Sequence, residues 1–139
     1  MGRLVIGMAA GALIAVAAMV PAKKDELQIM FSCDPKKEPV TEGDLLEVDW
    51  VGFGLVRMTR AAMQLVWDAA KPEDTYLEKG EERRSIFKNT IENGLFVGED
   101  VYFCRQYKAL GGRVWVDTSF RAGHVGFKTY TIPPVEELQ

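Results

Sequence analysis

The sequence has few of the residues that mark metal-binding, redox or nucleic-acid-binding proteins. Its 139 residues include two cysteines, Cys33 and Cys104, and a single histidine, His124. The two cysteines match no spacing typical of a metal or redox site, and a pair alone does not establish a disulfide. There are 17 basic against 20 acidic residues, so the net charge of -3 gives no electrostatic reason to expect a nucleic acid as partner.

Internal repeats and low-complexity tracts are also absent, and the composition is close to that of an average globular protein. Hydrophobic residues make up 47% of the chain and charged residues 27%, which excludes a chain that is disordered throughout. The length is that of one domain with enough residues to bury a core, so residues 1–139 are treated as a single domain.

One uncharged run, LVIGMAAGALIAVAAMV at residues 4–20, has three interpretations. As a signal peptide it could use AVAA for cleavage, although only Arg3 supplies the positive n-region. As a membrane span it is slightly shorter than the ~20 residues required and is rich in alanine and glycine. As part of a core, the half from residue 13 onwards has the pattern of a strand covered on both faces.

The rest of the chain predicts a mixed α/β domain. The alternating segment LLEVDWV at residues 45–51 predicts a half-buried strand that ends in a glycine-containing turn, Gly52-Phe53-Gly54. Thr59 can cap a helix over residues 60–70, and a second helix is predicted over residues 99–110 before a glycine pair. RVWVDT predicts a further strand that Asp117 closes. This order predicts a mixed sheet partly covered by helices.

Between the two predicted helices lies a charged segment, residues 71–94, which includes Glu81-Glu82-Arg83-Arg84. Charges of this density are costly to bury, so the segment is predicted to be a solvated insert or lid with a short helix over residues 83–93. Residues 131–139 are predicted to be a tail.

The second helix begins with two acids, Glu99 and Asp100. The helix dipole favours carboxylates there by ~0.3–1 kcal/mol, which explains both residues without a function. A carboxylate at a helix entrance just after a glycine could also accept a proton from a substrate hydroxyl. Both interpretations stay open on the residues alone.

His124, Trp50 and Cys104 each have a structural and a functional interpretation. His124 lies between Gly123 and Gly126 and could bind a divalent metal only together with carboxylates or substrate phosphates. Trp50 beside the glycine turn could be a core residue or could stack on a sugar or base face. Cys104 is interpreted as a small buried hydrophobic residue, because nothing near it in sequence would lower the pKa of a nucleophilic thiol.

Three segments in order resemble the second half of glycosyltransferases of the GT-A fold, closest to the family 2 type. They are VDWVGFGLVRMTR at residues 48–60, LFVGEDVYFCRQYKALGGRVWVD at residues 95–117 and RAGHVG at residues 121–126. The resemblance covers about residues 15–130 and is strongest from residue 48 onwards. It implies a partial GT-A fold and transfer of a sugar from a nucleotide-sugar donor to an acceptor hydroxyl.

The resemblance also implies roles for individual residues. Asp100 takes the place of the catalytic base of an inverting displacement, and Glu99 would orient the acceptor or cap the helix. His124 stands where the family has a histidine that helps to hold Mn²⁺ or Mg²⁺. The implied substrate-binding residues are Trp50, Gly52, Phe53 and Gly54.

One departure from the family pattern concerns the donor side. The family carries an Asp-x-Asp metal motif upstream, whereas here the nearest acid triplet, Glu47-Val48-Asp49, lies in the wrong strand. The chain is therefore expected to be the acceptor-side half of such an enzyme, a truncated form that binds nucleotide sugar weakly or not at all when alone. The alternatives are a non-catalytic α/β module that binds a sugar or a protein partner, or a small protein anchored in a membrane by residues 4–20.

The resemblance also bears on the N-terminal run. IAVAAMVPAKKDE at residues 14–26 resembles the family's strand and the irregular segment after it, which favours a core strand and a cytoplasmic location over a signal peptide or membrane association. If sheet neighbours are missing, residues 4–20 would favour self-association or contact with a membrane.

Overall fold

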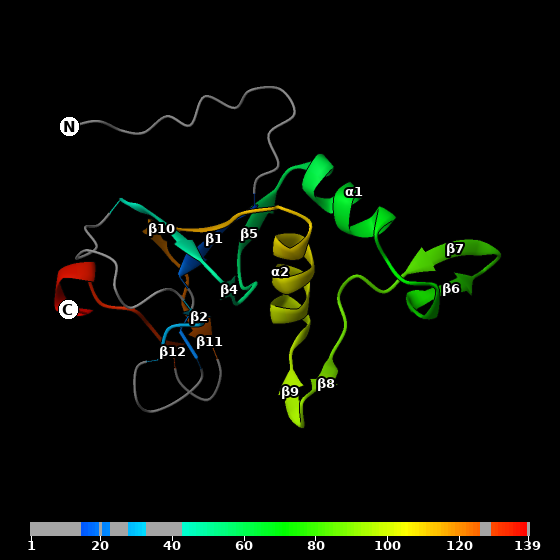
Figure 1. Cartoon of the computed structure of the whole chain (residues 1–139). Coiled ribbons are helices and arrows are strands. Elements are labelled where there is room, and N and C mark those ends of the chain that lie inside the picture. Colours follow the sequence, from blue (N-terminus) through cyan, green and yellow to red (C-terminus); the bar gives the residue numbers. More distant parts are fainter. Residues whose placement is uncertain (1–14, 20, 23–27, 33–42, 126–128, 139) are drawn as a thin grey trace.

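The chain folds as a mixed α/β protein around a four-stranded sheet, as predicted (Figure 1). The computed structural model describes residues 15–19, 21–22, 28–32, 43–125 and 129–138. The strand order is β3-β10-β1-β5, with bounds Leu45–Val48 for β3, Val114–Arg121 for β10, Ala15–Met19 for β1 and Val56–Met58 for β5. Strands β1 and β10 are parallel, and the two outer strands pair with them antiparallel.

Strand β1 confirms the prediction of a core strand at the end of the N-terminal apolar run. Its sequence is AVAAM, in which every residue except Val16 is buried. Ala15 pairs with Val114 and Ala17 with Val116. The earlier part of the run, residues 4–14, lies outside the described residues. Within the described residues, no helix has the length and apolarity needed to cross a bilayer.

Both long helices begin where their sequence signals predict. Helix α1, Arg60–Asp68, is capped by Thr59, whose hydroxyl accepts a hydrogen bond from the amide of Ala62 at 3.2 Å. Helix α2, Glu99–Ala109, is followed closely by Gly111, whose φ of +86° favours glycine. The two helices contact each other, and α2 also packs against the sheet side of the molecule (Figure 1).

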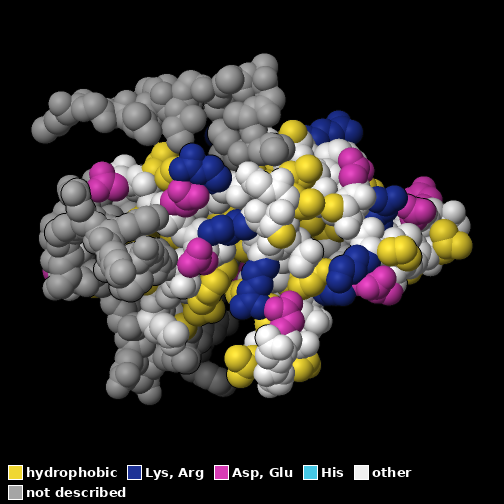
Figure 2. Space-filling view, viewed as in Figure 1, with side chains coloured by type: hydrophobic (Ala, Val, Ile, Leu, Met, Phe, Trp, Pro, Cys, Tyr) yellow, Lys and Arg dark blue, Asp and Glu magenta, His cyan; other side chains and the backbone are white. Residues whose placement is uncertain are grey.

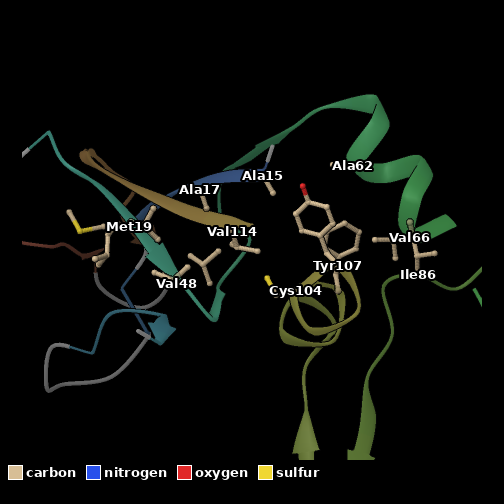
Figure 3. Close-up of a cluster of buried hydrophobic side chains, with 14 of the residues drawn as sticks. Ala15, Ala17, Met19, Val48, Ala62, Val66, Ile86, Cys104, Tyr107 and Val114 are labelled. Atoms are coloured by element: carbon tan, nitrogen blue, oxygen red, sulfur yellow. The ribbon is translucent and has the colours of Figure 1, made fainter. Parts of the chain in front are cut away.

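The core lies between the sheet and the two helices. Phe103, Cys104 and Tyr107 of α2 are fully buried. Figure 3 shows Cys104 and Tyr107 extending from α2 toward the sheet strands and α1. Packing here is tight enough that a Cβ on Gly112 would lie 2.3–2.5 Å from three atoms of the Tyr107 ring. Leu110, which has the same helical spacing, is 38% exposed and lies at the edge of this core.

The predicted strand over residues 45–51 is interrupted at Asp49. β3 ends at Val48, and a separate short strand, β4, Trp50–Val51, pairs with β2, Phe31–Ser32. The amide of Asp49 donates to the carbonyl of Ser32 at 2.7 Å, and its carboxylate accepts from Lys108 Nζ at 2.8 Å. The break shifts the alternation by one residue, so Val51 is fully buried and Trp50 only half-buried.

The short helix predicted over residues 83–93 is wrong, because this part of the insert forms β-hairpins. After a 3₁₀ turn η1, the strands are β6 paired with β7 and β8 paired with β9. Their bounds are Pro72–Asp74 for η1, Thr75–Glu78 for β6, Glu81–Arg84 for β7, Thr90–Glu92 for β8 and Leu95–Val97 for β9.

The hairpins form because their two-residue turns adopt positive φ. Lys79 and Gly80 have φ of 53° and 83°, and Asn93 and Gly94 have φ of 51° and 78°. Asn-Gly and related pairs favour this conformation, which matches the twist of the flanking strands. Figure 2 shows hydrophobic side chains exposed at the ends of both hairpins, with acidic and basic side chains interspersed over the rest of this face.

Strand β10 continues beyond Asp117, where it was predicted to close, as far as Arg121. It is followed by β11, His124–Val125, which pairs with β12, Thr129–Tyr130. Within the segment predicted to be a tail, a 3₁₀ turn η2 covers Val135–Leu138, and Ile132 and Val135 are buried in the core.

Candidate functional site

The entrance of α2 holds Asp100 in a defined position. Its Oδ1 accepts a hydrogen bond from the amide of Val101 at 2.8 Å. A Cβ on Gly98, the residue that caps the helix, would lie 3.2 Å from this Oδ1, so the glycine leaves room for the carboxylate. Asp100 is half-buried, and no described residue forms an ion pair with it. Its second oxygen is therefore available to accept a proton or a hydrogen bond.

Glu99 differs from its neighbour. It is exposed, and no hydrogen bond or ion pair joins it to another described residue. The favourable position of a carboxylate in the first turn of a helix is sufficient to explain it.

One face of α2 sets the direction in which Asp100 points. Asp100, Cys104 and Lys108 are spaced by four residues and share this face. Lys108 Nζ donates to the carbonyl of Val48 at 3.2 Å, and α2 contacts β4, the strand that holds Val51. Nearer the start of the helix, Phe103 contacts Phe53 of the glycine turn. From this contact we infer that Asp100, one turn before Phe103, lies near the glycine turn.

Packing alone explains why the first residue of the glycine turn is a glycine. Gly52 is buried, its amide donates to the carbonyl of Met30 at 2.6 Å, and a Cβ on it would lie 2.9 Å from Met30 Cβ. The close approach of the two segments requires a glycine here with or without a ligand. Gly54 is exposed, and Trp50 is half-buried against the core.

Phe53 belongs to an aromatic cluster that joins the glycine turn, α2 and the insert. Phe53 meets Phe103 edge to face with ring centroids 5.7 Å apart, and Phe87 stacks on Phe103 at 4.7 Å with an interplanar angle of 14°. Phe53 and Phe87 are also in edge contact at 6.1 Å. Sequence reasoning missed Phe87, because the charged composition of residues 71–94 indicated a solvated insert. Ile86-Phe87, an apolar pair within that segment, was the available signal.

The Cys104 thiol is not activated. Its side chain is fully buried, and this burial raises the pKa of the thiol from 9.0 to about 11. The thiolate that nucleophilic chemistry requires is therefore scarce at neutral pH. The interpretation of Cys104 as a buried hydrophobic residue fits this environment.

The position of His124 is described for the backbone only. Its strand, β11, lies in Figure 1 at the lower end of the molecule, the end at which α2 also begins. The imidazole lies outside the described residues. Among the residues that the structure describes, no three histidine, cysteine, aspartate or glutamate side chains lie close enough together to hold a metal ion.

A second polar cluster lies where the insert meets α2. The carboxylate of Asp74, only 7% exposed, forms an ion pair with Lys88 and accepts a hydrogen bond from the Tyr102 hydroxyl at 3.3 Å. The hydrogen bond to Asp74 raises the pKa of Lys88, and burial raises the pKa of Tyr102. Lys88 Nζ also lies 5.0 Å from the centre of the Tyr102 ring. The cluster fixes the base of the insert to α2.

Two hollows in the described part of the molecule lie away from Asp100. One, of about 100 Å³, is bounded by α1, α2 and the base of the insert, and Asp74, Ser85 and Tyr102 contribute to its wall. The other, of about 520 Å³, lies on the sheet face opposite α2 and is mostly apolar. Neither is lined by Asp100, by Glu99 or by the glycine turn.

No protein-family model, no curated protein and no solved structure matches this chain.

Proposed function

We propose that this chain is the acceptor side of a GT-A-type glycosyltransferase of the family 2 kind, with Asp100 as the general base. The observation that carries the proposal is the placement of Asp100. It is a half-buried carboxylate at a helix entrance, it has one unengaged oxygen, and it lies one turn before Phe103, which contacts Phe53 of the glycine turn. A cytoplasmic location belongs to the same proposal, because it rests on the same resemblance.

The proposed chemistry uses this carboxylate in a single displacement. Asp100 accepts the proton of the acceptor hydroxyl as the hydroxyl oxygen forms a bond to the anomeric carbon of the donor sugar. The bond from that carbon to the diphosphate breaks, and its electron pair leaves with the nucleoside diphosphate. Glu99, which is exposed and unpaired among the described residues, has a smaller part in this proposal and would orient the acceptor at most.

The donor side is not assigned to residues of this chain. The sequence contains no Asp-x-Asp motif, and the described residues supply no metal-holding cluster. Mn²⁺ or Mg²⁺, held with the help of His124, stays an expectation from the resemblance. The proposal therefore predicts weak binding of nucleotide sugars to the isolated chain. Isothermal titration with UDP-, GDP- and dTDP-sugars in the presence of Mn²⁺ measures it, and sub-millimolar affinity would contradict this part.

Turnover tests the function itself. The purified protein is incubated with millimolar nucleotide sugar, Mn²⁺ and a panel of saccharide acceptors, and release of nucleoside diphosphate is followed with and without acceptor. Because millimolar donor offsets weak donor binding, we expect slow release that depends on the acceptor, with a new glycosidic product detected by mass spectrometry. If no combination gives acceptor-dependent release, the catalytic proposal fails, and a non-catalytic binding module becomes the better interpretation.

A further inference from the structure

We propose that the exposed side of Phe87, together with Phe53, is a stacking platform for a sugar ring of the acceptor, so that the acceptor is a saccharide. This inference rests on the proposed function, because the platform is useful to transfer only if Asp100 acts on the same ligand. It concerns the substrate class, about which the resemblance implies nothing beyond a hydroxyl.

Phe87 has one covered and one open face. Its ring stacks nearly parallel on Phe103, which is fully buried, and the edge of Phe53 approaches it from the side. Phe87 is nevertheless 39% exposed. Since Phe103 covers one face of the ring, we infer that the exposed area of the side chain includes the opposite face.

The platform lies beside Asp100. Phe103 follows Asp100 by three residues, so the two side chains are neighbours on the helix surface. Side chains on a helix lean toward its start, which brings the Phe103 ring over the turn that carries Asp100. Since Phe87 and Phe53 both contact that ring, we infer that they lie near the carboxylate.

The platform is held in place from both sides. Ile86, the preceding residue, is 6% exposed and part of the core. Lys88, the following residue, forms the ion pair with buried Asp74. The backbone at Phe87 is thus anchored at both neighbours, which limits the conformational entropy that a ligand would have to remove on binding.

A pyranose ring has the chemistry that this surface requires. Aromatic faces carry partial negative charge and attract the polarised C–H groups of a sugar's apolar face, while the sugar hydroxyls project at the ring edge. A ring stacked on Phe87 would present an edge hydroxyl toward Asp100. Two simpler ligands each lack one of these features. An acyclic alcohol has a hydroxyl but no apolar ring face, and a phenol has an aromatic face but no ring of hydroxyls.

Saturation-transfer NMR tests the platform without turnover. The probes are the methyl glycosides of glucose, galactose, mannose and N-acetylglucosamine, with glycerol and phenol as comparison ligands. The variants are Phe87→Ala, Phe87→Leu, which keeps apolar packing on Phe103, and Phe87→Trp, which restores an aromatic face. Phe96→Ala is the matched control, because Phe96 lies in the same insert and is 70% exposed but has no aromatic partner among the described residues.

We expect at least one glycoside to receive saturation at its ring C–H protons and to bind about 3- to 10-fold more weakly to Phe87→Leu, the usual range for loss of an aromatic contact. Phe87→Trp should bind like wild type, and Phe96→Ala should be unchanged. The proposal is overturned if no glycoside binds, if Phe87→Leu binds like wild type, or if only phenol binds. Circular dichroism shows whether Phe87→Ala is folded, and if it is not, Phe87→Leu decides.

The variant Asp100→Asn separates this inference from the function on which it rests. It should keep the saturation pattern of wild type and lose transfer. If glycoside binding depends on Phe87 but the rate of transfer does not depend on Asp100, the sugar platform is supported and the catalytic role of Asp100 is refuted. If transfer depends on Asp100 but glycoside binding does not depend on Phe87, only the platform is refuted.

Discussion

Replacing Lys88 with methionine should loosen the insert from α2 while leaving the sheet intact. Methionine keeps most of the side-chain length that packs on Tyr102 but removes the charge that pairs with Asp74. In the variant the carboxylate of Asp74 stays buried, with the Tyr102 hydroxyl as its remaining side-chain partner.

The size of the effect follows from how deeply the pair is buried. Removing one partner of a fully buried ion pair costs about 3–5 kcal/mol, because the other charge is left uncompensated. The side chain of Lys88 is 30% exposed, so water reaches the pair and the expected cost is lower, about 2 kcal/mol. For a chain of this size that corresponds to a fall in Tm of roughly 6–8 °C.

Thermal unfolding followed by circular dichroism is the assay. Lys79→Met is the matched control, since Lys79 lies in an exposed hairpin turn without an ion pair among the described residues, and its Tm should stay within about 2 °C of wild type. The effect of pH gives a second readout. Asp74 raises the pKa of Lys88, so the stabilisation is fully present below the ordinary lysine value of 10.5 and is lost as the pH rises through the higher folded value.

The Tm difference between wild type and Lys88→Met should therefore be constant from neutral pH to about 10.5 and shrink above it. A variant that melts at the wild-type temperature at neutral pH would refute the reasoning. Asp74 would then not anchor the insert, and the account of how Phe87 is held in place would fail with it.

Three further predictions concern packing. Gly112→Ala places a methyl group against the buried Tyr107 ring and should cost about 2–3 kcal/mol in urea unfolding. Gly111→Ala meets open space and should cost only about 1 kcal/mol for its positive φ, so the reverse ranking would contradict the described packing. Gly52→Ala should lower stability by about 1–3 kcal/mol, and an unchanged midpoint would show that the neighbouring strand is not in close contact. In the folded protein at mildly alkaline pH, iodoacetamide should leave Cys104 unmodified until urea is added, and peptide mass mapping would expose rapid native labelling if the thiol were accessible.

The elements that could be predicted from the sequence are those whose signals are local. The hydroxyl of Thr59 marks the start of α1, the positive φ of Gly111 marks the end of α2, and the apolar composition around Ala17 marks a covered strand. Each of these signals lies within a few residues of the feature that it determines. No distant contact was needed to interpret them.

The features that were missed depend on distant partners or on a misjudged local signal. The break at Asp49 is fixed by Lys108, 59 residues away, which no alternation of hydrophobic residues shows. Asn93-Gly94 is a local hairpin signal, which the short helix predicted over residues 83–93 overlooks. Phe87 belongs to the site through its tertiary contacts with Phe103 and Phe53.

The candidate site was predictable in its residue types but not in its arrangement. The sequence placed Asp100 at a helix entrance. That Asp100 lies near the glycine turn is inferred from the tertiary contact of Phe103 with Phe53. Gly52, predicted to shape a substrate pocket, is required by its approach to Met30, which no sequence pattern indicates.

The central claim, that Asp100 accepts the proton of the acceptor, is tested most directly by kcat/KM for transfer in Asp100→Asn beside Glu99→Gln. We expect kcat/KM to fall at least about 100-fold in Asp100→Asn, with the fold and the acceptor affinity unchanged. In Glu99→Gln we expect kcat/KM to change by no more than a few-fold. Transfer at the wild-type rate by Asp100→Asn would contradict the central claim.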